Sequence, residues 1–166
     1  MRIRAATTAD VEALGRIALA AKASWGYSSS QLSAWRAELA VTAESLERWC
    51  TFVLEADGEL VAFTQVNPQS KPWALQALWV LPQHMHRGYG RALVQHAAAH
   101  AAASGQSELA IDSDPNAERF YLRCGARVVG QVSAPIEGAP DRVRPQLILA
   151  ISVLLDGRWL RQHRVP

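Results

Sequence analysis

Two glycines separated by one residue, Gly88 and Gly90, follow an apolar segment and open an alanine-rich one. Where a strand leads through such a loop into a helix, the free amide groups of the first helical turn and the helix dipole together bind anions. Glycine lets the backbone approach a phosphate closely because no Cβ intervenes. Arg87 and Arg91 add positive charge at the same place. The segment is therefore a candidate phosphate-binding loop, although an ordinary tight turn between a strand and a helix has the same pattern.

The loop differs from two familiar phosphate-binding motifs. The dinucleotide fingerprint G-x-G-x-x-G requires a glycine where this chain has Leu93. The phosphate loop of nucleotide hydrolases requires Gly-Lys-Ser/Thr, which does not follow the turn here. We therefore expect backbone amides and the two arginines to hold any phosphate group.

Two segments resemble the two signatures of the GCN5-related N-acetyltransferases. Residues 80–93 contain Val-x-Pro, a short loop and Gly-x-Gly-x-Ala-Leu, which is similar to the acetyl-CoA loop of that family. Met85 stands where the family core, Gln/Arg-x-x-Gly-x-Gly/Ala, prefers glutamine or arginine. Residues 112–126 contain Asn-Ala, Phe-Tyr and a later glycine, with Ala126 where phenylalanine is commoner. Since the N-terminal strand and helices also match the family layout, the resemblance covers most of the chain and implies the family fold.

The resemblance implies an enzyme that transfers the acetyl group of acetyl-CoA to a primary amine by direct attack in a ternary complex, without a metal. Asn116 would hydrogen-bond the pantetheine arm, and Tyr121 would be the general acid that protonates the CoA thiolate. The ordinary pKa of a phenol is about 10 and that of a thiol about 8.5. A phenol can therefore protonate a thiolate where the site holds the two groups close together. The alternative for Tyr121 is a core aromatic role beside Phe120. The backbone before the loop would hold pantetheine and the thioester oxygen, and the implied cofactor-binding residues are Leu78, Trp79, Val80, His86, Arg87, Gly88, Tyr89, Gly90, Arg91 and Asn116.

A general base is harder to assign. An amine nucleophile must lose a proton before it attacks, and many family members carry a carboxylate on the strand before the loop. Here the segment from Trp73 to Trp79 has none. Glu38, Asp112 and Asp114 are candidates, but each also reads as a surface or capping residue. An acceptor of low pKa would need no base.

Trp25 and Tyr27 flank Gly26 in a break between two predicted helices, where the resemblance implies the acceptor side. These rings could line an amine pocket through cation–π contacts, or they could plug the helix pair. The absence of an acidic cluster argues against a polycationic acceptor. His96 and His100 have a metal-compatible spacing but no third ligand, so we expect no metal site.

Hydrophobic periodicity predicts an α+β (α/β mixed) fold with one central, mostly antiparallel sheet of about six or seven strands flanked by helices. Asp57-Gly58 is typical of a hairpin turn. We expect one N-acetyltransferase-like domain over residues 1–151 and a basic tail, 152–166, that is loosely docked or disordered. The predicted helices cover about residues 8–23, 29–39 and 88–104, with shorter ones starting at Thr42 and Pro115; the predicted strands cover 2–5, 49–56, 59–65, 73–81, 109–111, 127–132 and 146–151.

Composition narrows the class of protein further. The chain has 166 residues and a formal net charge of +2, which is too small to indicate nucleic-acid binding. We expect no secretory signal and no membrane-spanning stretch, and we expect the two cysteines to be reduced. These expectations predict a cytoplasmic protein without a membrane partner. A homodimer is left open. The alternatives are a CoA-binding sensor or interaction module with degenerate catalysis, and an acetyltransferase of protein N-termini or lysines.

Overall fold

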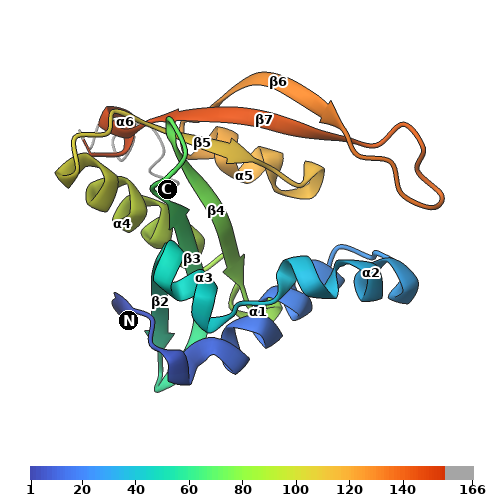
Figure 1. Cartoon of the computed structure of the whole chain (residues 1–166), viewed down its shortest axis with the longest axis horizontal. Helices are drawn as coiled ribbons and strands as arrows, with labels where there is room; N and C mark the ends of the chain where they lie inside the picture. Colours follow the sequence, from blue (N-terminus) through green and yellow to red (C-terminus); the bar gives the residue numbers. More distant parts are fainter. Residues whose placement is uncertain (156–166) are drawn as a thin grey trace, which may run out of the picture. The chain divides into compact units, whose positions relative to one another are not determined.

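The computed structural model describes residues 1–155, which form seven strands, six α-helices and three short 3-10 turns, labelled η (Figure 1). In chain order they are β1 (Arg2–Ala5), η1 (Thr8–Asp10), α1 (Val11–Ala23), α2 (Ser29–Leu39), α3 (Ala43–Arg48), β2 (Cys50–Ala56), β3 (Glu59–Asn67), β4 (Trp73–Val80), η2 (Pro82–His84), α4 (Tyr89–Ala103), β5 (Glu108–Asp112), η3 (Pro115–Ala117), α5 (Glu118–Arg123), β6 (Arg127–Ser133), β7 (Val143–Ala150) and α6 (Ile151–Leu155). No helix in this part of the chain is both long and apolar enough to cross a membrane.

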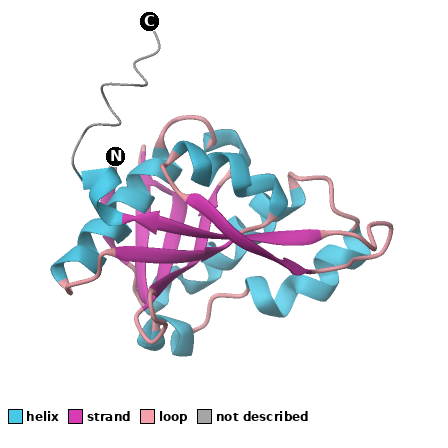
Figure 2. Cartoon of the chain, turned by 90° about the horizontal axis from the view of Figure 1, so that it is seen from above, coloured by secondary structure: helices cyan, strands magenta, loops and turns pink. Residues whose placement is uncertain are grey.

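The strands form one sheet in the order β1-β2-β3-β4-β5-β7-β6, drawn in magenta in Figure 2. The pairs β1/β2, β2/β3, β5/β7 and β6/β7 are antiparallel, and β4/β5 is parallel. The predicted fold class, a mostly antiparallel sheet of six or seven strands with flanking helices, is therefore confirmed. Within this topology the described chain divides into two compact units, residues 1–68 with 76–94, and residues 69–75 with the described residues that follow position 94.

The first unit is built on the β2–β3 hairpin. Its turn places Asp57 and Gly58 at φ values of 55° and 84°, the left-handed pair that a tight hairpin turn requires. Because side chains alternate along a strand, the paired Val53 and Phe63 pack against α1, whereas the neighbouring Leu54 belongs to a second buried cluster. Helix α1 contributes Leu14, Ile17 and Ala18 to the first cluster, and the beginning of α4 contributes Leu93 to the second.

The second unit is built on β5, β6 and β7. The paired residues Leu109 and Leu149 are fully buried. The sequence prediction was wrong at both ends of β7, which begins at Val143 and ends at Ala150. Proline has no amide hydrogen to donate. Pro145 is tolerated inside β7 because the ladder with β5 ends at Gln146, before Pro145 would have to donate. The Pro145 carbonyl still accepts a hydrogen bond from the Ser113 amide at 3.0 Å.

Ile151, predicted to end the last strand, instead begins α6. In this short helix Ile151 and Leu154 are buried. Residues 152–155, which the sequence placed in the tail, are thus helical, and the rest of that predicted tail lies outside the described residues.

An ion-pair network ties β1 to the start of the first helical segment. The two Asp10 carboxylate oxygens lie 2.8 and 2.9 Å from the Arg4 guanidinium nitrogens, and Arg4 Nε donates to Glu55 at 2.8 Å. Asp10 is 6% exposed and also accepts the Thr7 amide at 2.7 Å. The Arg4 hydrogen bond, helped by Thr7, holds the pKa of Asp10 well below its usual range, although desolvation opposes the shift.

Replacing Asp10→Asn is expected to lower the free energy of unfolding by about 2 kcal/mol near neutral pH, because bonds to a charged group are lost. The pKa of the Asp10 carboxyl is about 3.9 in the unfolded chain and lower in the folded protein. The wild type therefore has this stabilisation above about pH 3.9 and loses it as the pH falls below that value. Urea unfolding of both proteins over a pH series should show the difference shrinking in acid. Glu12→Gln, which breaks an exposed pair with Arg16, should change stability by less than about 1 kcal/mol. Equal stability of wild type and Asp10→Asn at neutral pH would contradict the prediction.

Candidate functional site

The predicted phosphate-binding loop connects β4 to α4. The chain leaves β4 at Val80, makes the η2 turn, and enters α4 at Tyr89. The first bond of the helix runs from the Ala92 amide to the Gly88 carbonyl at 3.0 Å. The amides that precede this bond in the first turn have no partner within the helix and form the positive end of its dipole.

The backbone of this loop has two left-handed residues. His86 and Gly88 have φ values of 61° and 83° and enclose Arg87 between them. Gly88 suits such a conformation, which L side chains rarely adopt, whereas His86 adopts it with a side chain. All three residues are exposed. Left-handed residues in a loop can turn neighbouring amides toward one concave surface, which is one geometry of a backbone anion site.

Packing within the first unit fixes the loop at both ends. Leu78 and Val80 of β4 lie against the buried cluster that includes Leu54 and Leu93. Tyr89 and Ala92 of the first helical turn lie against the same cluster. His84 of η2 stacks on Tyr89, with ring centroids 6.2 Å apart and an angle of 28° between the planes. The strand end and the helix start are therefore held to one core, which fixes the direction of the amides.

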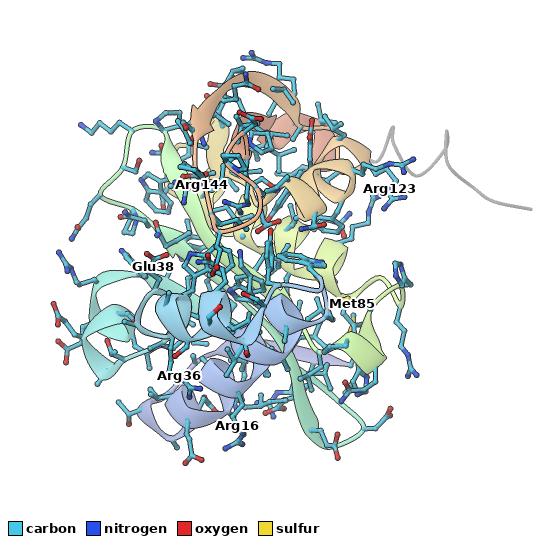
Figure 3. All side chains as sticks on the ribbon, turned by 90° about the vertical axis from the view of Figure 1, so that its right-hand side faces the viewer. Arg16, Arg36, Glu38, Met85, Arg123 and Arg144 are labelled. Atoms are coloured by element: carbon cyan, nitrogen blue, oxygen red, sulfur yellow. The ribbon has the colours of Figure 1, made fainter. Side chains whose placement is uncertain are left out.

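The pairing of β4 with β5 is short. The parallel ladder contains Trp73 opposite Leu109 and Ala74 opposite Ala110. The three residues predicted to offer backbone groups to pantetheine, Leu78–Val80, lie beyond this ladder in the sequence. Met85, where the family prefers glutamine or arginine, is half-buried after η2 (Figure 3).

An aromatic cage surrounds the ammonium of Lys22, which is 8% exposed. The Lys22 Nζ atom lies 4.3 Å from the ring centroid of Trp35, 5.1 Å from Tyr27, 5.4 Å from Trp25 and 5.9 Å from Trp79. The rings also contact each other in two pairs, Trp25 with Trp79 at 5.7 Å and Tyr27 with Trp35 at 4.9 Å. The cage therefore joins α1, the α1–α2 loop, α2 and β4 through contacts that compensate a buried cation.

Two residues of this cage, Trp25 and Tyr27, were predicted to line an acceptor pocket. Trp25 and Tyr27 do surround an ammonium group, but it is the ammonium of Lys22. Sequence reasoning missed Lys22 and Trp35. The sequence did contain one indication that Lys22 is buried. Lys22 follows Leu14 and Ala18 at a spacing of four residues, so it lies on the apolar face of the helix. Acceptor binding by Trp25 and Tyr27 stays a prediction.

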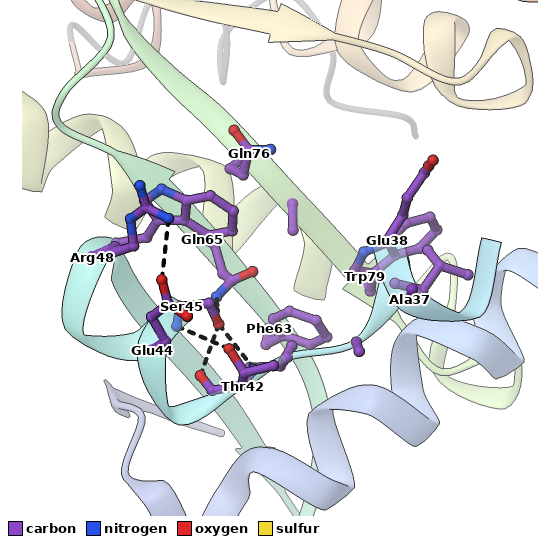
Figure 4. Close-up of a pocket in the computed structure, with 15 residues that line it drawn as sticks. Ala37, Glu38, Thr42, Glu44, Ser45, Arg48, Phe63, Gln65, Gln76 and Trp79 are labelled. Carbon is purple, nitrogen blue, oxygen red and sulfur yellow. Dashed lines mark hydrogen bonds and ion pairs between the residues drawn. The ribbon is translucent and has the colours of Figure 1, made fainter.

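A pocket of about 380 Å³ lies in the first unit beside β4 (Figure 4). Its wall combines the C-terminal part of α2, the link to α3, α3 itself, and side chains of β3 and β4. Gln65 is fixed in the wall, since its Nε2 donates to Thr51 at 3.1 Å and approaches the Ser45 hydroxyl at 3.5 Å. The lining residues are Ala37, Glu38, Leu39, Ala40, Val41, Thr42, Glu44, Ser45, Arg48, Trp49, Phe63, Gln65, Gln76, Ala77 and Trp79.

The two carboxylates of this pocket differ. Glu44 pairs with Arg48 at 3.4 Å, four residues further along α3. Glu38 is exposed (Figures 3 and 4) and makes no hydrogen bond or ion pair with any residue of the described part, 1–155. Trp79 lines the pocket and also belongs to the Lys22 cage, so one ring is shared by both features.

The second unit holds the other predicted residues. Tyr121 lies on α5, is buried, and meets Phe120 edge-on with centroids 5.1 Å apart. Burial, and secondarily the proximity of Cys124, raises the pKa of the Tyr121 hydroxyl above that of an ordinary phenol. Asn116 is exposed in η3, and both its amide and its side-chain Nδ2 donate to Asp114 at 2.9 Å.

The two other base candidates are engaged with arginines. Asp114 caps η3 and pairs with Arg142 at 3.0 Å, both side chains being less than 10% exposed. Asp112 pairs with Arg144 at 2.8 Å. Of the three carboxylates proposed from the sequence, Glu38 is thus the one outside an ion pair within the described residues.

The family model described as the acetyltransferase (GNAT) family matches residues 17–126, more than half of the chain. The chain belongs to this family. It is therefore an N-acetyltransferase-type acyltransferase, and the predicted recognition is confirmed.

Solved structures share the fold of this acetyltransferase. A GCN5-related N-acetyltransferase from Rhodopseudomonas palustris is 21% identical with a TM-score of 0.74, covering 90% of this chain and 94% of that one. A PaiA N-acetyltransferase from Thermoplasma acidophilum, in complex with coenzyme A, is 18% identical with a TM-score of 0.72, covering 90% and 98%. The ribosomal-protein-S18-alanine N-acetyltransferase from Escherichia coli is 21% identical with a TM-score of 0.68, covering 90% and 93%. No curated protein matches the sequence.

Removing the charge of Lys22 tests the cage. Lys22→Met is expected to lower the free energy of unfolding by about 2 kcal/mol, because the desolvated cation–π contacts disappear. Lys22→Arg, which keeps a cation that can stack on aromatic rings, should lose less. Urea unfolding followed by tryptophan fluorescence measures both. A methionine variant as stable as the wild type would show that the rings pack without help from the cation.

Proposed function

We propose that this acetyltransferase moves the acetyl group of acetyl-CoA to the primary amine of a compact small molecule by direct attack in a ternary complex. The observation that carries the proposal is the β4–α4 loop, where His86 and Gly88 adopt left-handed conformations before a helix N-terminus. A pocket of small-molecule size shares β4 with this loop. An anion cradle and an acceptor pocket on one strand are what a ternary complex requires.

The loop suits the pyrophosphate of acetyl-CoA. Amides of Gly88, Tyr89 and Gly90 would bind phosphate oxygens at the helix N-terminus, and Arg87 and Arg91 would neutralise charge. The exposed His86 would border the same group. Backbone groups of Leu78–Val80 and the side chain of Asn116 would hold the pantetheine arm. Acetyl-CoA, when bound, supplies an activated thioester carbonyl.

Tyr121 is the proposed proton donor. Attack of the neutral amine forms the C–N bond, and collapse of the tetrahedral intermediate breaks the C–S bond. The nitrogen releases one proton to water, and the thiolate that leaves must take up a proton. A phenol is protonated at neutral pH, and burial raises the pKa of Tyr121 further. The same burial makes it a weaker acid, so its contribution depends on a position close to the sulfur and on a similarly desolvated thiol.

The acceptor is proposed to occupy the pocket beside β4. A volume of about 380 Å³ corresponds to roughly a dozen water molecules at about 30 Å³ each, which suits a compact amine. Glu38 would attract the acceptor ammonium and take its proton, directly or through water. Trp79 offers an aromatic face, and Trp25 and Tyr27 would extend the aromatic wall. One unpaired carboxylate matches one ammonium, so a polycation would bring unmatched charges.

Thiol release from acetyl-CoA with a panel of amines tests this proposal. We expect compact monoamines to be faster than an aminoglycoside or a peptide with an N-terminal alanine. Glu38→Gln should raise the KM of the amine about tenfold, since one charge-assisted contact is lost, and leave the KM of acetyl-CoA unchanged. Glu47→Gln, on α3 but outside the pocket lining, is the matched control. CoA binding without turnover of any amine would favour a sensor, and preferred turnover of the peptide would favour a protein acetyltransferase.

Tyr121→Phe is expected to lower kcat about a hundredfold, the loss typical of a general acid, while acetyl-CoA affinity changes little. Calorimetry with CoA and steady-state thiol release separate the two effects. Circular dichroism checks that the buried ring is still accommodated. An unchanged kcat would remove Tyr121 from the mechanism.

A further inference from the structure

Asn116, which would hold the pantetheine arm, lies at the end of a chain of hydrogen bonds within the second unit. Its backbone amide and its side-chain Nδ2 both donate to the Asp114 Oδ1 atom at 2.9 Å. The other carboxylate oxygen of Asp114 accepts a hydrogen bond from the Arg142 guanidinium at 3.0 Å. The exposed Asn116 is thereby connected to two side chains that are less than 10% exposed.

The chemistry of these groups fixes how the Asn116 amide is turned. A charged carboxylate has only acceptor atoms, so the amide must present its Nδ2, and not its Oδ1, to Asp114. Arg142 favours the charged form of Asp114, because neutralising one partner of a buried ion pair leaves the other charge uncompensated. Since nitrogen and oxygen occupy different arms of an amide, Asn116 Oδ1 is turned away from Asp114.

Arg142 is held in place at the end of the loop that links β6 to β7, residues 134–142. Its side chain donates to the Ala134 carbonyl at 3.0 Å, and its own carbonyl accepts the Ala134 amide at 2.9 Å. The Arg142 amide donates to the Ala139 carbonyl at 3.2 Å. These bonds join the two ends of the loop, so the guanidinium approaches Asp114 from a fixed backbone position.

We propose that Arg142 is a positioning residue for acetyl-CoA: through Asp114 it turns Asn116 so that Oδ1 accepts a hydrogen bond from an amide N–H of pantetheine. This inference rests on the proposed function, in which Asn116 binds the pantetheine arm. An Asn116 amide turned the other way would set its Nδ2 against the pantetheine N–H, and two donors cannot form a hydrogen bond. Arg142 therefore acts on the ligand through two intervening side chains.

A neighbouring arginine provides the matched control. Arg144, two residues after Arg142, also pairs with an aspartate of the second unit, Asp112, at 2.8 Å. The Asp112 carboxylate accepts hydrogen bonds from Arg144 and Gln146, and none joins it to Asn116 among the residues that the structure describes. Arg144→Gln thus removes the same charge as Arg142→Gln without acting on the Asn116 amide.

Calorimetric titration with CoA, on the full chain, tests the proposal as a double-mutant cycle. Asn116→Ala should weaken CoA binding about tenfold, because one hydrogen bond is lost. Arg142→Gln should weaken it about fivefold, because the Asn116 amide is no longer held in one orientation. In the Asn116→Ala background, Arg142→Gln should change the affinity by less than about twofold, since its effect passes through Asn116. Arg144→Gln should stay below about twofold in both backgrounds.

Titration with 3′-phospho-ADP, the nucleotide part of CoA, distinguishes positioning from a general disturbance of the fold. This ligand lacks the pantetheine arm, so wild type and Arg142→Gln should bind it equally. If Arg142→Gln does not fold, Arg142→Gln combined with Asp114→Asn takes its place, because neither partner of the pair is then charged. This combination should also weaken CoA binding about fivefold, since an amide at position 114 can accept or donate and no longer selects Nδ2 of Asn116.

Three results would overturn the inference: an equal loss of CoA affinity from Arg142→Gln with and without Asn116→Ala, an unchanged CoA affinity in Asn116→Ala, or a parallel loss of 3′-phospho-ADP affinity in Arg142→Gln. None of them would refute acetyl transfer, which thiol release with the amine panel measures separately. The expected cycle of CoA affinities without turnover of any amine would support the positioning role of Arg142 and contradict the proposed acetyl transfer.

Discussion

The junction between β4 and α4 is the constraint on which the site depends. Amides can bind a phosphate only if they point the same way, and this direction is set where the strand stops and the helix starts. Leu78 and Val80 on one side, and Tyr89 and Ala92 on the other, pack on one buried cluster. Between them the chain turns through two left-handed residues, His86 and Gly88. The proposed anion site therefore depends on backbone direction fixed by apolar packing, and charged side chains would add to it without creating it.

The buried charged groups of the protein each have a partner, because burying an unpaired ion is costly. Asp114 is nearly buried with Arg142, and Asp10 is held by Arg4. Lys22 sits among four aromatic rings. Each of these groups has a partner that offsets the loss of water. An exposed carboxylate such as Glu38 has no such requirement, so it can stay outside an ion pair and remain able to meet a ligand.

The shared fold and the proposed acceptor pocket depend on different features of the chain. The related structures named above keep the fold at about one-fifth identity. The proposed amide cradle would need a strand, a turn and a helix more than particular side chains. The proposed acceptor pocket is lined by side chains of α2, α3 and the strands, and these side chains would decide which acceptor fits. Met85 illustrates the difference, since the loop forms although this position departs from the family preference.

The sequence alone determined the features that depend on neighbouring residues. The helix at 29–39 was predicted with its observed ends, the Asp57-Gly58 turn was predicted from its residue types, and the glycine loop was placed before a helix. Local spacing, capping and φ preference encode all three. The end of β7 at Ala150, the acceptance of Pro145, the cage around Lys22 and the ion pairs of Asp112 and Asp114 were decided by tertiary structure. Each depends on which distant segments become neighbours, and long-range packing, not local propensity, selects those.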